Sequence, residues 1–365
     1  MTTTQLAEAV VTNELIARIL QCPDCNGTLG TDLLCTGCGR SFVPADDGII
    51  SALPSDLQRP DTNKEQLQAL IDAGGAPDTQ TQNIVLYERA FHDEQAAYYD
   101  RLFADPLPLQ DYYRHLVRDQ IYDCLRNVPF IVDLCCGTGK SSAPLIDRGL
   151  TVIGIDVSRE MLRVYRKKSG GKPNPILIHA DASRPPLRKN SCVAVSMIGG
   201  LHHIPDQAGS LQCCCDALAD GGLLILHEPL KTGQVSTLAR LVENLYAVTD
   251  PVRVWGALRR RLGLRSRQRS AANATQAAAP ADFTPYEHPF TSADELLAEL
   301  PRNMRTVLLR SQGGLSFRQF PPYLQTRFGH PLAAAIVRLD DWISRTRPSD
   351  WSGDALFGVF RKELC

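Results

Sequence analysis

Three aspartates stand at the carboxyl ends of consecutive apolar runs in the middle of the chain. Asp133, Asp156 and Asp181 each end a predicted strand. Because the carboxyl ends of parallel strands meet at one edge of a sheet, we expect the three carboxylates to lie together around a ligand. A single aspartate at such a position could merely cap a helix or a turn. Three in succession favour a binding site.

The first of these strands runs into a glycine loop. In Asp-Leu-Cys-Cys-Gly-Thr-Gly, residues 133–139, the glycines let the backbone approach a ligand before a helix begins. Dinucleotide-binding enzymes share a strand, a glycine loop and a helix. Here Ser142 stands where the third glycine of the dinucleotide pattern would be, and Asp133 could bind an ammonium group. The loop therefore favours a ligand with an ammonium group over a dinucleotide.

Four cysteines near the N-terminus form two Cys-x-x-Cys pairs, Cys22 with Cys25 and Cys35 with Cys38. Each pair can place two thiolates on one metal ion, and four thiolates make a closed tetrahedral site, most often for zinc. Iron uses the same ligands, but nothing in the sequence suggests an electron-transfer partner. The sequence therefore predicts a structural Zn²⁺ site that takes no part in catalysis.

The composition limits the classes of function. Hydrophobic residues make up 44% of the 365 residues and charged residues 22%, as in a globular protein. The formal net charge of −1 argues against a surface built throughout for nucleic acid. We see neither a secretory signal nor a membrane-spanning stretch. We therefore expect a cytoplasmic protein whose 12 cysteines stay reduced.

From about residue 84 onward, apolar runs alternate with amphipathic stretches, which is typical of an α/β fold with a covered parallel sheet. We expect a cysteine-rich ribbon over residues 1–54, a polar linker over 55–83 and a larger domain over 84–365. Residues 230–290 would form an insertion between the fifth and sixth strands. Strands are predicted at residues 130–134, 151–156, 176–181, 192–198, 223–227, 305–310 and 355–361, with a helix at 158–168 that Ser158 would cap.

Residues 130–228 resemble class I S-adenosylmethionine-dependent methyltransferases, in particular the group that includes the quinone-biosynthetic enzymes. Residues 133–139 resemble the first motif, and Gly-Ile-Asp-Val-Ser-Arg-Glu-Met-Leu (154–162) resembles the second. The third, fourth and fifth motifs of the family are similar to His-Ala-Asp-Ala (179–182), residues 197–204 and residues 218–224. The resemblance implies a Rossmann-like, seven-stranded sheet with a helical lid formed by the insertion. The family commonly has an aspartate where this chain reads Ser-Cys-Val-Ala (191–194), which implies a repacked start of that strand.

This resemblance also implies which residues bind S-adenosylmethionine. Asp133 and the backbone of residues 137–139 would hold the methionine end, and Asp156 would accept the ribose hydroxyls. Asp181 and Ala182 would recognise the adenine edge. The complete predicted set is Tyr99, Asp133, Cys135, Gly137, Gly139, Asp156, Val157, Met161, Asp181 and Ala182, with Tyr98 as the alternative to Tyr99 on a helix that closes over the cofactor.

Methyl transfer from a sulfonium needs little from the protein beyond alignment of the acceptor and removal of water. A general base is required only where the acceptor must lose a proton. His202 and His203 follow the fourth strand, beside the expected methyl group, and Glu228 follows the fifth. These three residues are the candidate catalytic groups. Each could instead only position a substrate or a loop.

Seven arginines between residues 253 and 269 occur with no acidic residue among them. Such a run is either solvated surface or a contact for an anionic substrate, a membrane surface or RNA. The ribbon itself, through Phe42, Asp47 and Gly48, resembles the zinc ribbon fused to ribosomal-RNA guanine methyltransferases. It also resembles small ribbon proteins that partner other methyltransferases.

Taken together, these features predict a methyltransferase acting on a small-molecule or lipid-like acceptor in specialised biosynthesis. An RNA base methyltransferase is the first alternative, favoured by the ribbon and the arginines and opposed by the overall charge. The second alternative is a non-catalytic partner protein that binds the cofactor, which the intact motifs disfavour.

Overall fold

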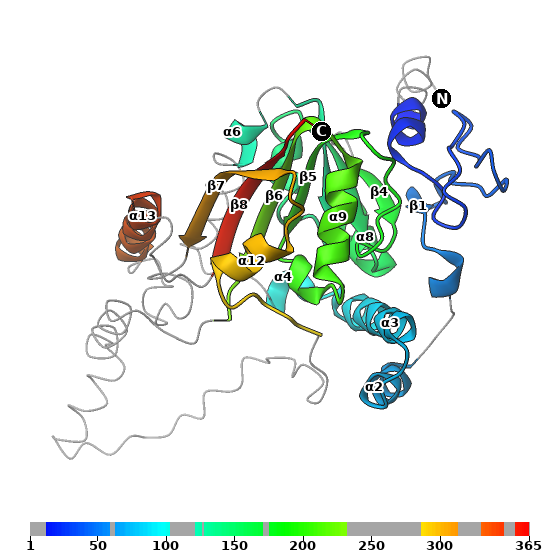
Figure 1. The fold of residues 1–365 in the computed structure, drawn as a ribbon, viewed down its shortest axis with the longest axis horizontal. Coiled ribbons are helices and arrows are strands. Elements are labelled where there is room, and N and C mark those ends of the chain that lie inside the picture. The colour runs from blue at the N-terminus through cyan, green and yellow to red at the C-terminus, as the bar shows by residue number, and fades with distance from the viewer. Residues whose placement is uncertain are drawn as a thin grey trace.

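The structure is a computed structural model and describes residues 12–58, 63–102, 121–125, 128–170, 175–231, 286–312, 330–346 and 355–364. These residues form a mixed α/β fold around one central sheet, with helices on both faces (Figure 1). The predicted α/β, Rossmann-like fold is confirmed. Most of the predicted 230–290 insertion, with the arginine run and the expected lid, lies outside the described residues.

The described sheet has eight strands in the order β1-β4-β3-β2-β5-β6-β8-β7. The strands are β1 (Ile49–Ser51), β2 (Phe130–Leu134), β3 (Thr151–Asp156), β4 (Ile176–His179), β5 (Cys192–Ile198), β6 (Leu218–Pro229), β7 (Met304–Gln312) and β8 (Ala355–Lys362). Neighbours among β1 to β6 run parallel, whereas β8 is antiparallel to β6 and β7. Strands buried on both faces need largely apolar runs, and β2 and β5 are apolar apart from Asp133 and Ser196, which hydrogen-bond to each other.

The chain changes direction across the sheet at β2, and this sets the place for a ligand. From β2 it moves outward through β3 to β4, then returns to the other side of β2 as β5 and continues to β6. The connections that leave β2 and β5 therefore diverge above adjacent carboxyl ends. In open α/β sheets such a divergence leaves a crevice in which ligands bind.

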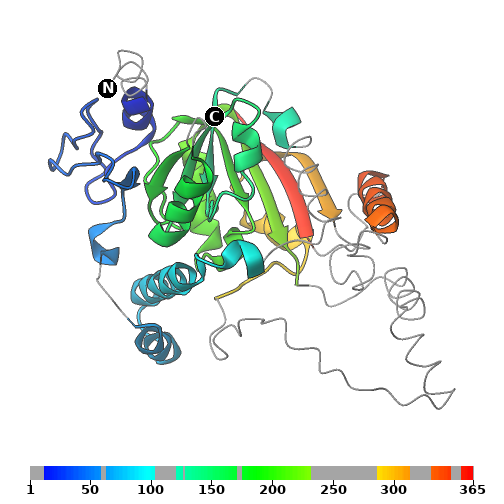
Figure 2. The ribbon, with the colours of Figure 1, turned by 180° about the vertical axis from the view of Figure 1, so that it is seen from behind.

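Alternate side chains of the strands enter cores on opposite faces of the sheet. Val132 belongs to the core under α9 and α12, which lie in front of the sheet in Figure 1. Its neighbour Ile131 belongs to the core under α7 and α13 on the face seen in Figure 2. The helices on these faces are α6 (Tyr122–Cys124), α7 (Ala143–Ile146), α8 (Arg159–Lys168), α9 (Gln207–Ala217), α12 (Ala293–Glu299) and α13 (His330–Thr346).

Helix α8 starts at the predicted cap. The hydroxyl of Ser158 accepts the backbone N–H of Met161 at 3.1 Å, and basic residues fill the last turn. The helix carries Met161 toward the carboxyl edge of the sheet and buries Tyr165 beneath the glycine loop. The Ser158 cap thus determines where α8 begins, and α8 forms one wall of the crevice.

The cysteine-rich segment is joined to the sheet. Its strand β1 pairs with β4, so the sheet has one strand more than the seven predicted. Asp47 forms ion pairs with Arg159 (2.8 Å) and Arg163 (3.1 Å) of α8. Buried residues of the segment, such as Phe42, belong to the same core as Val132 of β2. The cysteine-rich segment and the sheet therefore share one interior.

The polar composition of residues 55–83 predicts a linker, but the described part of this segment is largely helical. It contains η1 (Ser55–Leu57), α2 (Lys64–Asp72) and the start of α3 (Pro77–Gln95), which is followed by α4 (Tyr99–Leu102). Leu57 and Leu67 pack with residues of α3 in a small core. Apart from Leu70, the exposed side chains of α2 are mostly polar, and this is why composition alone suggests a linker.

Candidate functional site

A cleft of about 680 Å³ lies at the carboxyl edge of the sheet, where its strand order reverses. The lining residues are Val85, Glu88, His92, Tyr99, Cys135, Gly137, Asp156, Val157, Met161, Asp181, Ala182, Ser183, Gly199, Gly200, His203, Ile204 and Pro205. All predicted cofactor residues line it except Asp133 and Gly139. Tyr98, the alternative to Tyr99, does not.

The glycine loop after β2 turns sharply toward the cleft. Cys135, Gly137 and Gly139 all have left-handed backbone conformations, with φ of 54°, 51° and 76°. At Gly139 a Cβ atom would lie 2.2 Å from the ring of Tyr165, so this glycine is required by packing. At Gly137 no atom lies within 4 Å of where a Cβ would be, and the residue lines the cleft. The open side of Gly137 is therefore where a ligand can approach the backbone.

Asp156 ties the loop to the end of β3. Its Oδ2 accepts the N–H of Gly137 and its Oδ1 accepts the N–H of Ser158, each at 2.8 Å. Burial raises the pKa of Asp156 above the ordinary carboxyl value, while these backbone donors oppose the rise. The carboxylate thus lines the cleft with its position fixed from two sides.

Asp181 and Asp133 occupy different environments. Asp181 lines the cleft and accepts bonds from the N–H (2.8 Å) and hydroxyl (2.7 Å) of Ser183, and burial raises its pKa. Asp133 lies beneath the loop and accepts the hydroxyl of Ser196 at 2.7 Å. Burial raises the pKa of Asp133 to about 6, although the Ser196 hydroxyl opposes the rise. Two of the three predicted acids therefore meet at the cleft, and the third supports the loop from behind.

Tyr99 reaches the cleft from α4, and the helix is tied to the glycine loop next to it. Asp100 accepts the hydroxyl of Thr138 at 2.6 Å and pairs with Lys168 at 2.8 Å. Burial and the nearby Asp156 carboxylate raise the pKa of Tyr99 to about 12. The Tyr99 hydroxyl therefore stays protonated and can donate a hydrogen bond, and the Tyr99 ring can form an apolar part of the cleft wall.

The three predicted catalytic residues are split between the cleft and the core. His203 lines the cleft, whereas His202 and Glu228 do not. The Glu228 carboxylate accepts the N–H groups of Gly200, Leu201 and His202 at 3.0–3.3 Å, and it lies 2.7 Å from Nδ1 of His202. Burial opposes its ionisation, but His202 and the backbone donors hold its pKa below the ordinary value. Glu228 and His202 thus hold the turn η3 (Leu201–His203), and this turn places His203 at the cleft.

The four predicted metal ligands come together. The Sγ atoms of Cys22 and Cys38 are 3.7 Å apart, those of Cys25 and Cys35 are 3.5 Å apart, and all four lie within 4.8 Å of one another. A tetrahedral ion with Zn–S bonds of about 2.3 Å needs sulfurs about 3.8 Å apart. A Cβ on Gly27 would lie 2.8 Å from Sγ of Cys35, so the tight turn needs glycine. The donor set and its spacing fit a structural Zn²⁺ ion.

Among the described residues, no helix is both long and apolar enough to cross a membrane.

The middle of the chain is similar to known proteins. Residues 132–226 match the family model described as a methyltransferase domain. A demethylmenaquinone methyltransferase of Clavibacter sepedonicus is 35% identical over 98 residues, which cover 27% of this chain and 40% of the relative. The enzyme of that name from Staphylococcus aureus MRSA252 is 36% identical over 100 residues, covering 27% and 42%. The chain thus spans about two fifths of the length of these relatives.

Two solved structures resemble the chain over a longer range. One is a complex between the Haloferax volcanii Trm112 methyltransferase activator and a methyltransferase, with 16% identity, a TM-score of 0.43, and coverage of 75% of this chain and 98% of that chain. The other is an S-adenosylmethionine-dependent methyltransferase of Thermotoga maritima, with 16% identity, a TM-score of 0.42, and coverage of 76% and 100%.

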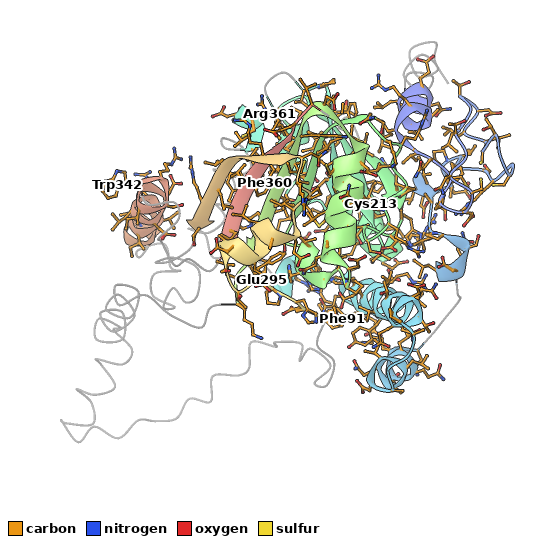
Figure 3. The ribbon with its side chains drawn as sticks, viewed as in Figure 1. Phe91, Cys213, Glu295, Trp342, Phe360 and Arg361 are labelled. Carbon is orange, nitrogen blue, oxygen red and sulfur yellow. The ribbon has the colours of Figure 1, made fainter. Side chains whose placement is uncertain are left out.

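The wall of the cleft formed by α3 was not predicted from the sequence. Val85, Glu88 and His92 lie on one face of this helix, and all three line the cleft. Figure 3 labels Phe91, which lies on the same helix. A buried glutamate and a histidine four residues apart, on a helix with the apolar run Ile84–Leu86, give a weak signal for a site. The turn residues Gly199, Gly200, Ile204 and Pro205, and Ser183 after β4, were also not predicted.

Proposed function

We propose that the protein is an S-adenosylmethionine-dependent methyltransferase whose cofactor lies in the cleft above β2, β3 and β5. The observation that carries this proposal is the joint presence of Gly137, Asp156 and Asp181 around one cleft at the reversal of the sheet. A ligand-facing glycine and two carboxylates suit the backbone, ribose and adenine contacts of this cofactor. The methyltransferase-domain match over residues 132–226 supports the same reading.

In this proposal each wall of the cleft has a role. Asp156 accepts the ribose hydroxyls, Val157 and Met161 lie against the adenine, and Asp181 with Ala182 receives its amino group. Gly137 and the Cys135 backbone border the methionine end. Because Asp133 does not reach the cleft, it acts on that end only through the position of the loop.

The bound cofactor supplies an activated methyl group on a sulfonium. The protein residues then have to orient the acceptor and exclude water. Val85, Ile204 and Pro205 form an apolar part of the cleft, next to His203. This surface suits a small-molecule or lipid-like acceptor, and the demethylmenaquinone methyltransferase relatives point to the same class.

We also propose that Cys22, Cys25, Cys35 and Cys38 hold one structural Zn²⁺ ion. Their thiolates are at metal-ligand spacing, and the ion would stabilise the fold of this segment. Four thiolates must stay reduced to bind a metal, so we propose a cytoplasmic location.

Incubation of the purified protein with methyl-labelled S-adenosylmethionine tests the proposed activity. A metabolite and lipid extract and, separately, ribosomal RNA serve as acceptor pools, with mass spectrometry as the readout. We expect label in small molecules of the extract. Label in RNA alone would replace this proposal with the RNA base methyltransferase, and label in neither pool would favour a non-catalytic partner protein.

The arginines at positions 259–261 give a second arm of this test, although they lie outside the described residues. If these arginines contact an RNA phosphate backbone, replacing all three should make the slope of the logarithm of the RNA-binding constant against the logarithm of salt concentration shallower by up to about two to three. We expect RNA binding no tighter than micromolar at physiological salt. Nanomolar binding that disappears in the triple variant would contradict the small-molecule acceptor.

A further inference from the structure

Two adjacent histidines each face a buried carboxylate, but only one of the two pairs lines the cleft. Nδ1 of His202 lies 2.7 Å from Oε2 of Glu228, and Nδ1 of His203 lies 3.2 Å from Oε2 of Glu88. His202 and Glu228 are occupied with the backbone of η3. His203 and Glu88 both line the cleft. The second pair can therefore act on a bound acceptor.

The surroundings of His203 determine which ring nitrogen carries its proton. Nδ1 lies 3.0 Å from the carbonyl oxygen of Tyr286, and a carbonyl can only accept a hydrogen bond. Neutral His203 therefore carries hydrogen on Nδ1 and keeps a lone pair on Nε2. A histidine held in this tautomer can take a proton at Nε2.

The two oxygens of Glu88 are in different situations. Oε1 accepts the backbone N–H of Tyr286, at the point where the chain returns after residues 232–285. Oε2 is buried and accepts no hydrogen bond of good geometry from the residues that the structure describes, although Nδ1 of His203 is 3.2 Å away and Nδ1 of His92 is 3.4 Å away.

Both histidine N–H groups are directed elsewhere. That of His203 points to the Tyr286 carbonyl, and that of His92 points to the backbone carbonyl of Glu88 at 2.9 Å. The short distances to Oε2 therefore become ion pairs only when a ring is protonated. The Glu88 side chain is only 6% exposed, and a buried carboxylate oxygen without a donor is costly unless a positive charge forms beside it. His203 and Glu88 are therefore arranged so that the His203 ring can receive a proton.

We propose that His203 is the general base of the methyl transfer, that Glu88 is its positioning residue, and that the acceptor is a hydroxyl compound that must lose its proton. This inference rests on the proposed methyltransferase function. The acceptor O–H gives its proton to Nε2 of His203, and the oxygen lone pair forms the new bond to the methyl carbon. The electron pair of the broken C–S bond returns to sulfur.

The products are a methyl ether, neutral S-adenosylhomocysteine and an imidazolium that later releases its proton to water. Glu88 forms and breaks no bond in this step. Its charge stabilises the imidazolium, and the fixed tautomer keeps Nε2 available.

The charged and titratable groups around His203 are Glu88 and His92 on α3, His202 on η3, and Tyr286 and Glu287 on the returning segment. Burial disfavours the imidazolium, but Glu88, the Tyr286 carbonyl and Glu287 together raise the pKa of His203 above its ordinary value. Protonated His203 cannot accept a further proton, so activity should fall as the pH drops through the pKa of His203. Removing the Glu88 charge should move that fall to lower pH.

The test is NMR of the full-length, zinc-loaded protein with ¹⁵N-labelled histidine, with and without S-adenosylhomocysteine, and with His203→Gln to assign the signal. We expect His203 to carry hydrogen on Nδ1 at high pH and to titrate at lower pH in Glu88→Gln. The matched control is Glu94→Gln, which removes an exposed carboxylate from the same helix and should leave the His203 titration unchanged.

An Nε2–H tautomer, or the same His203 titration in Glu88→Gln as in wild type, would overturn the proposal. Because the titration needs no acceptor, this result stays separate from failure of the methyltransferase function, which would appear as absent S-adenosylhomocysteine binding.

Product analysis tests the acceptor class. In the metabolite-extract reaction we expect the label on oxygen, and a rate at saturating acceptor at least tenfold lower in Glu88→Gln with little change in KM. Label on a neutral amine, or a raised KM with unchanged kcat, would instead make Glu88 an acceptor-binding group and contradict the proposal.

Discussion

The cysteine cluster is assembled entirely within residues 22–38, whereas the cleft is lined by residues from Val85 to Pro205. The cluster depends on local turns, such as the one at Gly27, and on the metal it is proposed to hold. The cleft depends on the strand order of the sheet, which brings distant loops together. Substitutions in the cluster and substitutions in the cleft should therefore have different effects on the protein.

The regions are nevertheless in contact. Ala52, just after β1, donates its N–H to the carbonyl of His179 at 2.9 Å, and the His179 ring lies 2.9 Å from the carbonyl of Val157 in the cleft wall. Asp24, between Cys22 and Cys25 of the cluster, accepts the N–H of Ser55 at 2.8 Å. Through these contacts, damage to the cluster should reach the cleft wall at Val157, where we propose that the adenine lies, but with a smaller effect.

The largest effect should come from Cys22→Ser. We expect loss of nearly all of the one zinc ion per chain and a clearly lower Tm for the whole protein, because the segment shares its core with the sheet. Elemental analysis and thermal unfolding measure both. The control is Cys213→Ser on α9, away from the cysteine-rich segment in Figure 3, which should keep its zinc. Wild-type protein without metal, purified without chelator, would refute the zinc assignment.

Asp156→Ala should come next in size and act mainly on the cleft, whose glycine loop the Asp156 carboxylate also holds. Loss of a charged acceptor for the ribose hydroxyls costs about 1.5–3 kcal/mol, or roughly a 10- to 150-fold weaker affinity for S-adenosylmethionine. Calorimetry measures this on a variant that still binds zinc and shows a cooperative unfolding transition. Unchanged affinity in such a variant would remove Asp156 from the site.

The two glycines of the loop should separate stability from binding. Gly139→Ala drives a methyl group into the ring of Tyr165 and should destabilise the protein by about 1–3 kcal/mol. Gly137→Ala meets no protein atom, so beyond backbone strain of about 1–2 kcal/mol its main effect should be on cofactor affinity. Urea unfolding and calorimetry on both variants test this. Equal effects on stability and binding in both would contradict the assignment.

The smallest effect should come from the contact between the cysteine-rich segment and α8. Asp47→Asn breaks the ion pairs with Arg159 and Arg163 and should cost about 1 kcal/mol. Burial opposes ionisation of Asp47, but the two arginines hold its pKa below the ordinary value. This stabilisation is therefore complete above the unfolded carboxyl pKa of about 4 and is lost as the pH falls through the folded pKa.

Urea unfolding of wild type and Asp47→Asn should accordingly differ at pH 7 and converge in acid. The exposed neighbour Asp46 supplies the control, since Asp46→Asn should change stability little at either pH. A constant difference at all pH values would rule out the ion pairs as its cause.

Local signals in the sequence predict much of this molecule. The Ser158 cap, the left-handed glycines of the loop and the four cysteines all act over a few residues, and the structure has each of them where it was expected. The residues of α3 that line the cleft could not be predicted in this way. Glu88 meets His203 only because the sheet and the helix bring distant parts of the chain together.

The pairing of β1 with β4 was missed for a related reason. Ile49–Ser51 is a three-residue strand, too short for a clear alternation, and its partner lies far along the chain. The burial of Asp133 was also not foreseen. In the register of the two strands Asp133 lies opposite Gly154, two residues before Asp156, so its carboxylate stays within the sheet beneath the loop while that of Asp156 reaches the cleft.

We propose that the cleft above β2, β3 and β5 holds S-adenosylmethionine. Calorimetric titration of the wild-type, zinc-loaded protein with S-adenosylhomocysteine tests it most directly. We expect one site per chain with an affinity in the micromolar range or tighter, and we expect this binding to be lost or strongly weakened in Asp156→Ala. No detectable binding by a protein that is folded and carries its zinc would contradict it.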